Sequence, residues 1–263
     1  MNPVSLQPLD LAIAALLVAF DALLSVALRL RLHRQVLVAA ARMVVQLVAI
    51  GYVLRWVFAL KNPAATLAIV LVMAAIAARE IAARPERRFR GAAGLLLSIN
   101  GVVIATLVTV ALALATAIRP HPWYDARYAV SLTGIILGSV LNAGSLALDS
   151  FLSAVGRERP AIEARLALGE AFHDAIAPLL RDAVRRGLLP VINQMSAAGV
   201  ITLPGIMTGQ ILAGLDPLEA VKYQILLMFL LAGASGLSAL VIAYGAMSRL
   251  TDERQRLRLD RLR

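Results

Sequence analysis

The stretch PAIEARLALGEAFHDAIAPLLRDAVRRGLLPVINQMSAAGVITLPGIMTGQILAG, residues Pro160–Gly214, joins two segments of opposite character. The first, Pro160–Pro190, is charged, has the period of an amphipathic helix and is too polar to cross a membrane. The second, Val191–Gly214, carries no charge and is rich in small residues. Hydrophobic spans lie on both sides. The stretch therefore predicts a cytoplasmic amphipathic element that is joined directly to an intramembrane element.

The composition is that of a polytopic helical membrane protein. The 263 residues are 60% hydrophobic and 16% charged, with a mean hydropathy of +0.80, whereas soluble domains are about a quarter charged. Cysteine is absent, which excludes disulfides and thiolate metal sites. The net charge of +10 comes from arginines that cluster between apolar spans. This distribution is typical of membrane topology signals and argues against a nucleic-acid partner.

Seven segments have the length and apolar character of membrane spans, for which about 20 residues are needed. They are Leu9–Leu28, Val36–Leu60, Pro63–Ala78, Gly94–Ile118, Ala129–Leu148, Val191–Ala213 and Tyr223–Met247. The third is short and the sixth is interrupted. We therefore expect an all-α protein with one transmembrane domain over residues 1–263. A cytoplasmic coupling element, residues 149–190, would lie between spans five and six, and an Arg-rich tail, residues 248–263, would follow span seven.

The distribution of basic residues predicts the orientation. Twenty of the 26 Lys and Arg residues follow spans one, three and five or lie in the tail, and five lie on the opposite side. Basic residues accumulate on the cytoplasmic side of a membrane. We therefore expect the N-terminus outside and the C-terminus inside, a parity that seven spans satisfy.

Two charged side chains lie inside the first two spans. Asp21 and Arg42 are each eight residues from a loop arginine, which places both about 12 Å from the cytoplasmic boundary. A charge in hydrocarbon is costly unless it is paired or hydrated. We favour a structural salt bridge between them, with Gln46 one turn further along the same face as Arg42. A gating pair, or a part of the translocation path, is the alternative.

The sixth span contains Pro204, which removes a backbone donor in mid-span and is followed by Gly205. Broken helices at membrane depth are tolerated where they are buried or line a watery cavity, and they often mark binding sites. A translocation path and a kinked, well-packed helix both stay open. The path would include Asn142 of span five and these residues of span six: Asn193, Gln194, Met195, Thr202, Pro204, Met207, Thr208 and Gln210. Met195 and Met207 are candidate soft ligands, and the metal itself stays unknown.

Pairs of glycines four residues apart occur in spans five and six, at Gly134 and Gly138 and at Gly205 and Gly209. Such pairs let helix backbones approach closely. We expect tight packing within one subunit, with a dimer seam or a pore wall as the alternative.

The coupling element has apolar residues that are mostly three or four apart: Ile162, Leu166, Phe172, Ile176, Leu180, Val184 and Leu188. Pro160 suits the first turn of a helix. Pro178 should break or bend it, so we expect two helical pieces that meet near Ala177. Glu170, His173 and Asp174 have the spacing of a metal site, although a solvated face or a protein contact is the more frequent meaning.

No catalytic constellation is visible. The sequence contains no nucleophile-elbow Gly-x-Ser-x-Gly, no metalloprotease motif and no Walker A motif. If ATP drives transport here, the ATPase must be a separate chain.

Several motifs resemble those of ABC transporter permeases. Glu163-Ala164 followed by Gly169 resembles the EAA loop of ABC importer permeases, which docks on the ATPase, although the Leu-Pro that ends such loops comes later, at Leu189-Pro190. The chain is more similar to the FetB/YbbM family of ABC permeases, which includes bacterial iron exporters and a plant aluminium-tolerance permease. The resemblance covers nearly the whole chain and rests on RMVVQL (Arg42–Leu47), EARLALG (Glu163–Gly169), LRDA (Leu180–Ala183) and LPGIMTGQILAG (Leu203–Gly214).

This resemblance implies a homodimeric permease in the bacterial inner membrane that exports iron or a related metal. It implies two partners, a cognate ABC ATPase subunit and membrane lipid. The chain would bind no cofactor itself, because ATP and Mg²⁺ would sit on the ATPase. The ATPase-coupling residues would be Glu163, Ala164, Leu166, Gly169, Phe172, Arg181 and Asp182.

Two other classes of function stay open. The first is a secondary transporter of a small solute or metal that is driven by an ion gradient, with Asp21 as its titrating group. The second is an intramembrane enzyme, for which the sequence lacks a catalytic set.

Overall fold

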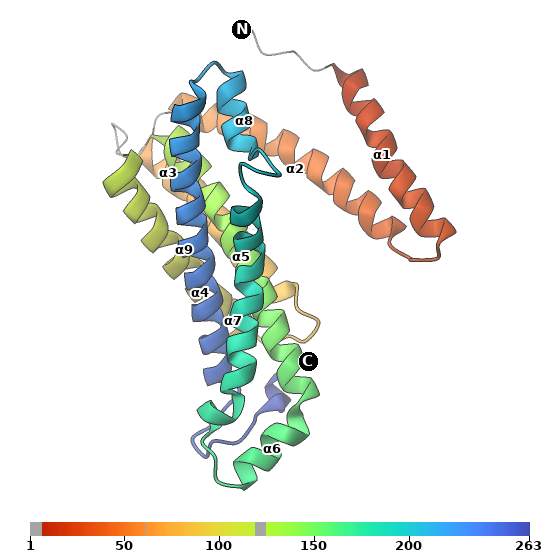
Figure 1. Ribbon diagram of the computed structural model, residues 1–263, viewed down its shortest axis with the longest axis vertical. Coiled ribbons are helices and arrows are strands. Elements are labelled where there is room, and N and C mark those ends of the chain that lie inside the picture. The colour runs from red at the N-terminus through yellow and green to blue at the C-terminus, as the bar shows by residue number, and fades with distance from the viewer. Residues whose placement is uncertain (1–6, 61, 119–124) are drawn as a thin grey trace. The chain divides into compact units, whose positions relative to one another are not determined.

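The computed structural model describes residues 7–60, 62–118 and 125–263, and this part of the chain is helical throughout, as predicted (Figure 1). The α-helices are α1 (Pro8–Ala27), α2 (His33–Leu60), α3 (Pro63–Ala83), α4 (Ala93–Leu112), α5 (Ala126–Arg157), α6 (Arg159–Ala167), α7 (Phe172–Ala197), α8 (Gly205–Leu212) and α9 (Pro217–Arg249). A π-helical segment, η1 (Ala113–Ile118), extends α4, and a 3₁₀ turn, η2 (Leu259–Arg261), lies in the tail.

Six of the described helices are long and apolar enough to cross a membrane: α1, α2, α3, α4 with the start of η1, α5 and α9. They correspond to six of the seven predicted spans. The remaining span, Val191–Ala213, is not a single helix, because α7 ends at Ala197 and α8 begins only at Gly205. The expected interruption is therefore present. It is a loop, with Gly199 in the left-handed region at φ +80°, and Pro204 lies directly before α8 rather than within a helix.

The chain divides into two compact units, and the first comprises residues up to Asn62 together with Leu212–Gly214. Its helices α1 and α2 pack against each other. The turn between them is tight, since Arg29 and Arg31 adopt left-handed φ values of 54° and 60°, and Ser25 Oγ accepts a hydrogen bond from the Leu32 N–H at 2.9 Å. Most apolar side chains of α1 and α2 are exposed, as expected for helices that face lipid.

The second unit, Pro63–Ile211 with Leu215–Arg263, is a bundle in which α5 and α9 pack against each other, and both also pack against α4 and α7. Its fully buried side chains include Ile136, Phe151 and Ile242. α5 has 32 residues and α9 has 33, so at about 1.5 Å per residue each is close to 50 Å long. Both helices are therefore longer than a hydrocarbon core of about 30 Å.

Glycines set the closest approaches within this bundle. An added Cβ would lie 2.4 Å from Ile242 Cγ1 at Gly101 and 2.6 Å from Ile242 Cδ1 at Gly144, so the side chain of Ile242 fits between the backbones of α4 and α5. Gly187 of α7 is similarly constrained, because a Cβ there would lie 2.9 Å from the Ala143 carbonyl oxygen and 3.0 Å from Ala239 Cβ. α7 is therefore held against α5 and α9 at this point.

The glycine pairs singled out by spacing are not these contacts. A Cβ at Gly134 would approach Met73 Cε at 3.1 Å, whereas Gly138, Gly205 and Gly209 have no described atom in that space. The expected tight packing within one subunit is thus found only at Gly134. Spacing alone missed Gly101, Gly144 and Gly187, because a close contact depends on which atoms of the neighbouring helices lie opposite each glycine.

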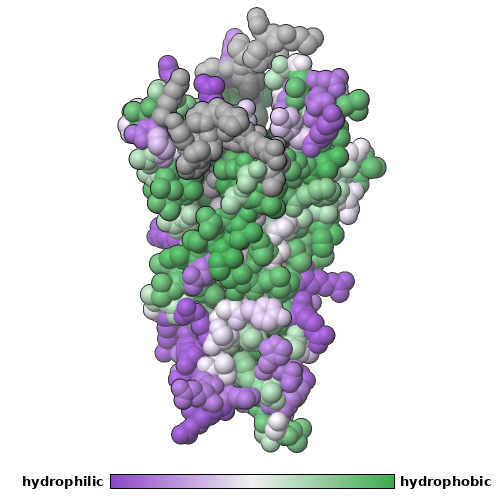
Figure 2. All heavy atoms as spheres, turned by 90° about the vertical axis from the view of Figure 1, so that its left-hand side faces the viewer, coloured by the Kyte–Doolittle hydropathy of each residue, from purple (hydrophilic) through white to green (hydrophobic). Residues whose placement is uncertain are grey.

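The surface of the bundle is banded. Figure 2 shows apolar side chains in a belt across the middle of one face and hydrophilic side chains gathered at its lower end. The lower end carries α6, the start of α7 and the C-terminal residues (Figure 1). This polar end contains the candidate coupling residues.

Candidate functional site

The α6–α7 turn shapes the polar end. α6 follows α5 after a single residue, Glu158, and begins with Pro160 in its first turn, as predicted. It ends at a turn in which Gly169 has φ +89°, a conformation that costs other residues free energy because their Cβ clashes with the backbone. A Cβ at Gly169 would meet nothing within 4 Å. Glycine is therefore needed at this position for its backbone conformation. The expected close contact with an ATPase stays a prediction.

Pro178 does not break the element, so the prediction of two helical pieces that meet near Ala177 was wrong, and a bend at Pro178 stays a prediction. α7 runs continuously through Pro178 and Pro190, and the junction of the two helical pieces lies at Leu168–Ala171. At Pro178 the structure supplies a substitute donor. A proline at position 178 cannot bond the carbonyl of Asp174, and the Arg165 guanidinium reaches it instead, with Nη2 at 3.4 Å from Asp174 O and Nη1 at 2.8 Å from Ala175 O.

Arg165 also fixes the turn. Its Nε and Nη2 donate to the two carboxylate oxygens of Glu170 at 2.6 and 2.5 Å, a bidentate pair. One side chain of α6 therefore joins the end of the turn to the first turns of α7. We call Arg165, Glu170 and the carbonyls of Asp174 and Ala175 the turn clamp. Glu170 faces Arg165 and not a metal, and the described residues hold no group of three His, Asp or Glu side chains suited to a metal.

The predicted coupling residues differ in exposure. Glu163, Ala164, Gly169, Arg181 and Asp182 are exposed, and Leu166 is half-buried. Phe172, by contrast, is buried in the core, so in this chain it anchors the start of α7. Glu163 is held by Arg159 Nε at 2.8 Å, and Asp182 by Arg186 Nε at 2.9 Å.

Leu168 is the most exposed large apolar side chain in the described residues, at 89%. It projects from the α6–α7 turn at the polar end, beyond the apolar belt. A single exposed leucine is ordinary on a protein surface. What distinguishes Leu168 is its place at the α6–α7 turn, next to the predicted coupling residue Gly169 and at the end of the helix that carries Glu163. Spacing alone did not single it out.

The C-terminal tail is folded onto the bundle, and counting its arginines as a topology signal did not predict this. Arg88 and Arg263 exchange backbone hydrogen bonds of 3.1 and 2.8 Å, and the Arg90 N–H donates to Arg261 O at 2.8 Å. The side chains between these partners, Phe89 and Leu262, are buried. The leucines interspersed in RLRLDRLR (residues 256–263) are the signal that could have indicated a packed segment.

A turn at Asp252 starts the tail. The Asp252 carboxylate accepts hydrogen bonds from the Arg254 and Arg256 N–H groups, both at 3.0 Å, and from Arg256 Nε at 2.9 Å. The bonds from Arg256 lower the pKa of Asp252 to about 2. Further along, Arg258 forms a bidentate pair with Asp260, which lowers the pKa of that carboxyl to about 2.

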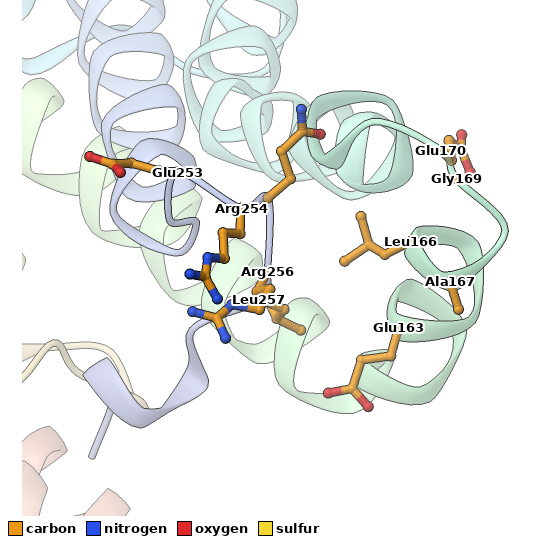
Figure 3. A pocket seen from close by; sticks show the side chains of 10 residues that line it. Glu163, Leu166, Ala167, Gly169, Glu170, Glu253, Arg254, Arg256 and Leu257 are labelled. Carbon is orange, nitrogen blue, oxygen red and sulfur yellow. The ribbon is translucent and has the colours of Figure 1, made fainter.

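The turn and the tail enclose a groove of about 770 Å³ (Figure 3). Its walls are Glu163, Leu166, Ala167, Gly169 and Glu170 on one side and residues 253–257 on the other. Gln255 Oε1 accepts a hydrogen bond from the Phe172 N–H at 2.9 Å, and this bond joins the tail to the first residue of α7. Sequence reasoning did not identify Gln255.

Asn142 lies in an open surface pocket of about 430 Å³, lined by Arg84, Asn142, Ser145, Leu146, Asp149 and Pro190. Arg84 Nη1 donates to Asn142 Oδ1 at 3.5 Å, and Asp149 Oδ1 accepts from the Glu86 N–H at 3.0 Å. This pocket brings one predicted path residue next to Pro190 of α7, Asp149 of α5 and Arg84 just after α3, none of which had been assigned to a path.

The other predicted path residues follow the α7–α8 connection. Asn193, Gln194 and Met195 are exposed on the last turns of α7, and Thr202 is exposed in the loop. Pro204, Met207 and Thr208 are half-buried. The Oε1 of Gln210 is buried and has no hydrogen-bond partner among the described residues. Asp21, Arg42 and Gln46 are exposed on the first unit, and the Asp21–Arg42 salt bridge stays a prediction.

Comparison with known proteins identifies the family. Residues 8–251 match the family described as "Uncharacterised protein family (UPF0014)". The chain belongs to this family. A UPF0014 membrane protein from Synechocystis is 39% identical over 228 residues, 87% of each chain. The Escherichia coli protein named "Probable iron export permease protein FetB" is 30% identical over 266 residues, all of this chain and 99% of that one.

The UPF0014 relatives extend to plants. The rice UPF0014 membrane protein STAR2 is 34% identical over 231 residues, 88% of this chain and 79% of the rice protein. No solved structure is similar to the chain. The resemblance to a family of membrane permeases is therefore confirmed at the level of family.

Proposed function

We propose that the chain is the permease subunit of an ABC exporter in the bacterial inner membrane. A separate ATPase would power it, and its cargo would be iron or a related metal. Family membership supports a membrane permease, and the name of the Escherichia coli relative supports iron export. The single observation that supports ATPase coupling is the clamped α6–α7 turn, which presents Leu168, 89% exposed, beside Glu163 and Gly169 at the polar end of the bundle.

The geometry supports a lever mechanism. α7 is continuous from the turn clamp at Phe172 to Ala197, a length of about 39 Å for its 26 residues. Gly187 holds it against α5 and α9 between those ends. Displacement of the turn by a docked ATPase would therefore tilt α7 about Gly187. The far end of α7 is the broken segment 198–204, where a change in direction would alter the path around α8.

We further propose that the end of α7, the loop and α8 together form the sixth of seven crossings. In Figure 1, α7 and α8 follow one another along the length of the bundle, which α9 then covers in the opposite direction. Seven crossings with the basic polar end inside would leave the N-terminus outside. The exposed apolar surfaces would contact lipid and a second copy of the chain in a homodimer.

The test is purification of the chain with the ATPase that accompanies it, followed by measurement of binding and of metal-stimulated ATP turnover in proteoliposomes. Leu168→Glu should reduce ATPase affinity at least tenfold, since a buried anchor at such an interface is replaced by a charge. Leu168→Met, which keeps the apolar contact, should bind like the unchanged protein. Normal ATPase binding and transport by Leu168→Glu would contradict the proposal.

A secondary transporter remains the second candidate because Asp21 is a carboxylate within the apolar helix α1. A chain of this kind would accumulate metal in liposomes without ATP under a proton gradient. Asp21→Asn would abolish that uptake. The ABC exporter requires the ATPase and ATP instead.

A further inference from the structure

The groove in Figure 3 has two walls, which come from segments of the second unit that are far apart in the sequence. The α6–α7 turn supplies one wall, and this wall carries the predicted coupling residues Glu163, Leu166 and Gly169. The tail supplies the other, with Arg254, Arg256 and Leu257. Figure 3 shows Leu166 pointing from α6 across the groove toward the tail. The groove is therefore continuous with the proposed ATPase-docking surface.

Some charged side chains of the two walls have an ion-pair partner and others do not. On the turn wall, Glu163 pairs with Arg159, and Glu170 pairs with Arg165. On the tail wall, Arg256 pairs with Asp252 at 2.8 Å. The Arg254 side chain has no ion-pair partner within the described residues, and only its backbone N–H is engaged, by Asp252. The Glu253 carboxylate on the same wall has no ion-pair partner within the described residues either, and in Figure 3 it points away from α6. The groove thus presents half-buried Leu166 and Leu257, with the unpaired side chains of Arg254 and Glu253 on the tail wall.

The tail wall is fixed rather than loose. Two sets of bonds hold it: the backbone pairing of residues 261–263 with residues 88–90, and the Gln255 bond to the start of α7. Gln255 has φ +55°, a conformation that is unfavourable for a residue with a Cβ, and the bond to Phe172 is made from that conformation. A preformed wall loses little conformational freedom when a partner binds.

We infer that the C-terminal tail is the second half of the ATPase-docking site. A segment of the ATPase inserts an apolar side chain between Leu166 and Leu257 and places a carboxylate against Arg254. Gln255 connects that contact to α7, so the ATPase acts on the lever at two points. This inference rests on the proposed function. It gives the tail a contact with the ATPase, which goes beyond the role of its arginines as a topology signal.

Charge reversal at one arginine tests the inference. Arg254→Glu should lower the affinity of the detergent-solubilised chain for its ATPase at least tenfold, and the remaining binding should depend less on salt. Arg90→Glu is the matched control, because Arg90 is an exposed arginine at the same end that does not line the groove, and its backbone bond to Arg261 O survives the change. Arg90→Glu should change the affinity less than twofold.

Substitutions of Gln255 test the connection to α7. Gln255→Ala removes the acceptor for the Phe172 N–H, and Gln255→Gly removes it while relieving the left-handed backbone. Both should lower ATP-driven transport at least fivefold. If Gln255→Gly transports like the unchanged protein, the side chain does not couple the tail to α7. Elution on gel filtration and the melting temperature show whether each variant is folded.

The outcomes separate the inference from the proposed function. Loss of binding in both Leu168→Glu and Arg254→Glu supports both. Loss in Leu168→Glu with normal binding in Arg254→Glu overturns the tail contact and leaves the ABC exporter standing. Equal loss in Arg254→Glu and Arg90→Glu shows a general charge effect and also overturns the tail contact. Normal binding in every variant, or no ATPase at all, overturns both.

Discussion

The turn clamp leads to a prediction about two residues that lie far apart in the sequence, Arg165 and Pro178. If Arg165 replaces the donor that Pro178 lacks, the two residues must be energetically coupled. In a helix interior, proline costs about 3 kcal/mol relative to alanine, partly because the carbonyl four residues earlier loses its partner. In this chain that carbonyl belongs to Asp174 and receives Arg165 Nη2. Pro178→Ala should therefore stabilise the protein more when Arg165 is absent than when it is present.

The structure sets the magnitude. Arg165 makes two bonds to Glu170 and two to backbone carbonyls, and its side chain is 41% exposed, so each bond belongs at the low end of the range for charged donors. Arg165→Ala should cost about 1–3 kcal/mol. The part coupled to Pro178 is a single hydrogen bond at 3.4 Å, which is about 0.5–1.5 kcal/mol.

A double-mutant cycle measures this coupling. Melting temperatures in detergent are compared for the unchanged protein, Arg165→Ala, Pro178→Ala and the pair, where 1 kcal/mol corresponds to about 2–4 °C in a protein of this size. Pro190→Ala is the matched control, because Pro190 also lies inside α7 but no bond joins its surroundings to Arg165. If the change in melting temperature caused by Pro178→Ala is the same with and without Arg165, as expected for Pro190→Ala, then Arg165 does not replace the donor that Pro178 lacks.

Two further predictions concern packing and pH. Gly187→Ala should lower the melting temperature, because its methyl group would crowd the Ala143 carbonyl. Gly138→Ala is the control, since Gly138 faces open space. Equal melting temperatures of the two variants would show that α7 is not held at Gly187. The pKa of Asp252 is lowered to about 2, so its contribution to tail stability is complete above about pH 4 and is lost as the pH falls through 2. Asp252→Asn should weaken the pH dependence of the melting temperature over that range, while Asp260, whose pKa is also lowered to about 2, keeps part of it. An unchanged profile would refute the assignment.

Most of the fold followed from hydropathy and proline rules. Long apolar runs such as Pro217–Arg249 have few alternatives in a membrane, and the break before Gly205 was visible because proline and glycine stand together. The course of α7 through Pro178 was not visible. Local rules treat a proline by its own missing donor, whereas the Asp174 carbonyl that Pro178 leaves without a donor receives a guanidinium from a residue thirteen positions before the proline.

The candidate site was predictable where residue type alone decides. Glu163 was expected on a polar face of the coupling element and is exposed there, because that property is local. The turn at Gly169 was not predicted, since the junction was expected near Ala177. The role of the tail was not predictable from charge counts, because an arginine that signals topology looks the same as one that lines a groove. Gln255 acquires its role only from the fold, which brings it to the N–H of Phe172.

The lengths of α5 and α9 have a consequence for where force is applied. Each is close to 50 Å long, and a hydrocarbon core takes up about 30 Å of that. By the predicted spans, α5 extends past the apolar layer on the side of the turn by residues 149–157, which is about 13 Å of helix. With the proposed orientation, this extension carries the α6–α7 turn on its end. Its stiffness would deliver a push on the turn to the membrane-embedded part of α5 without bending.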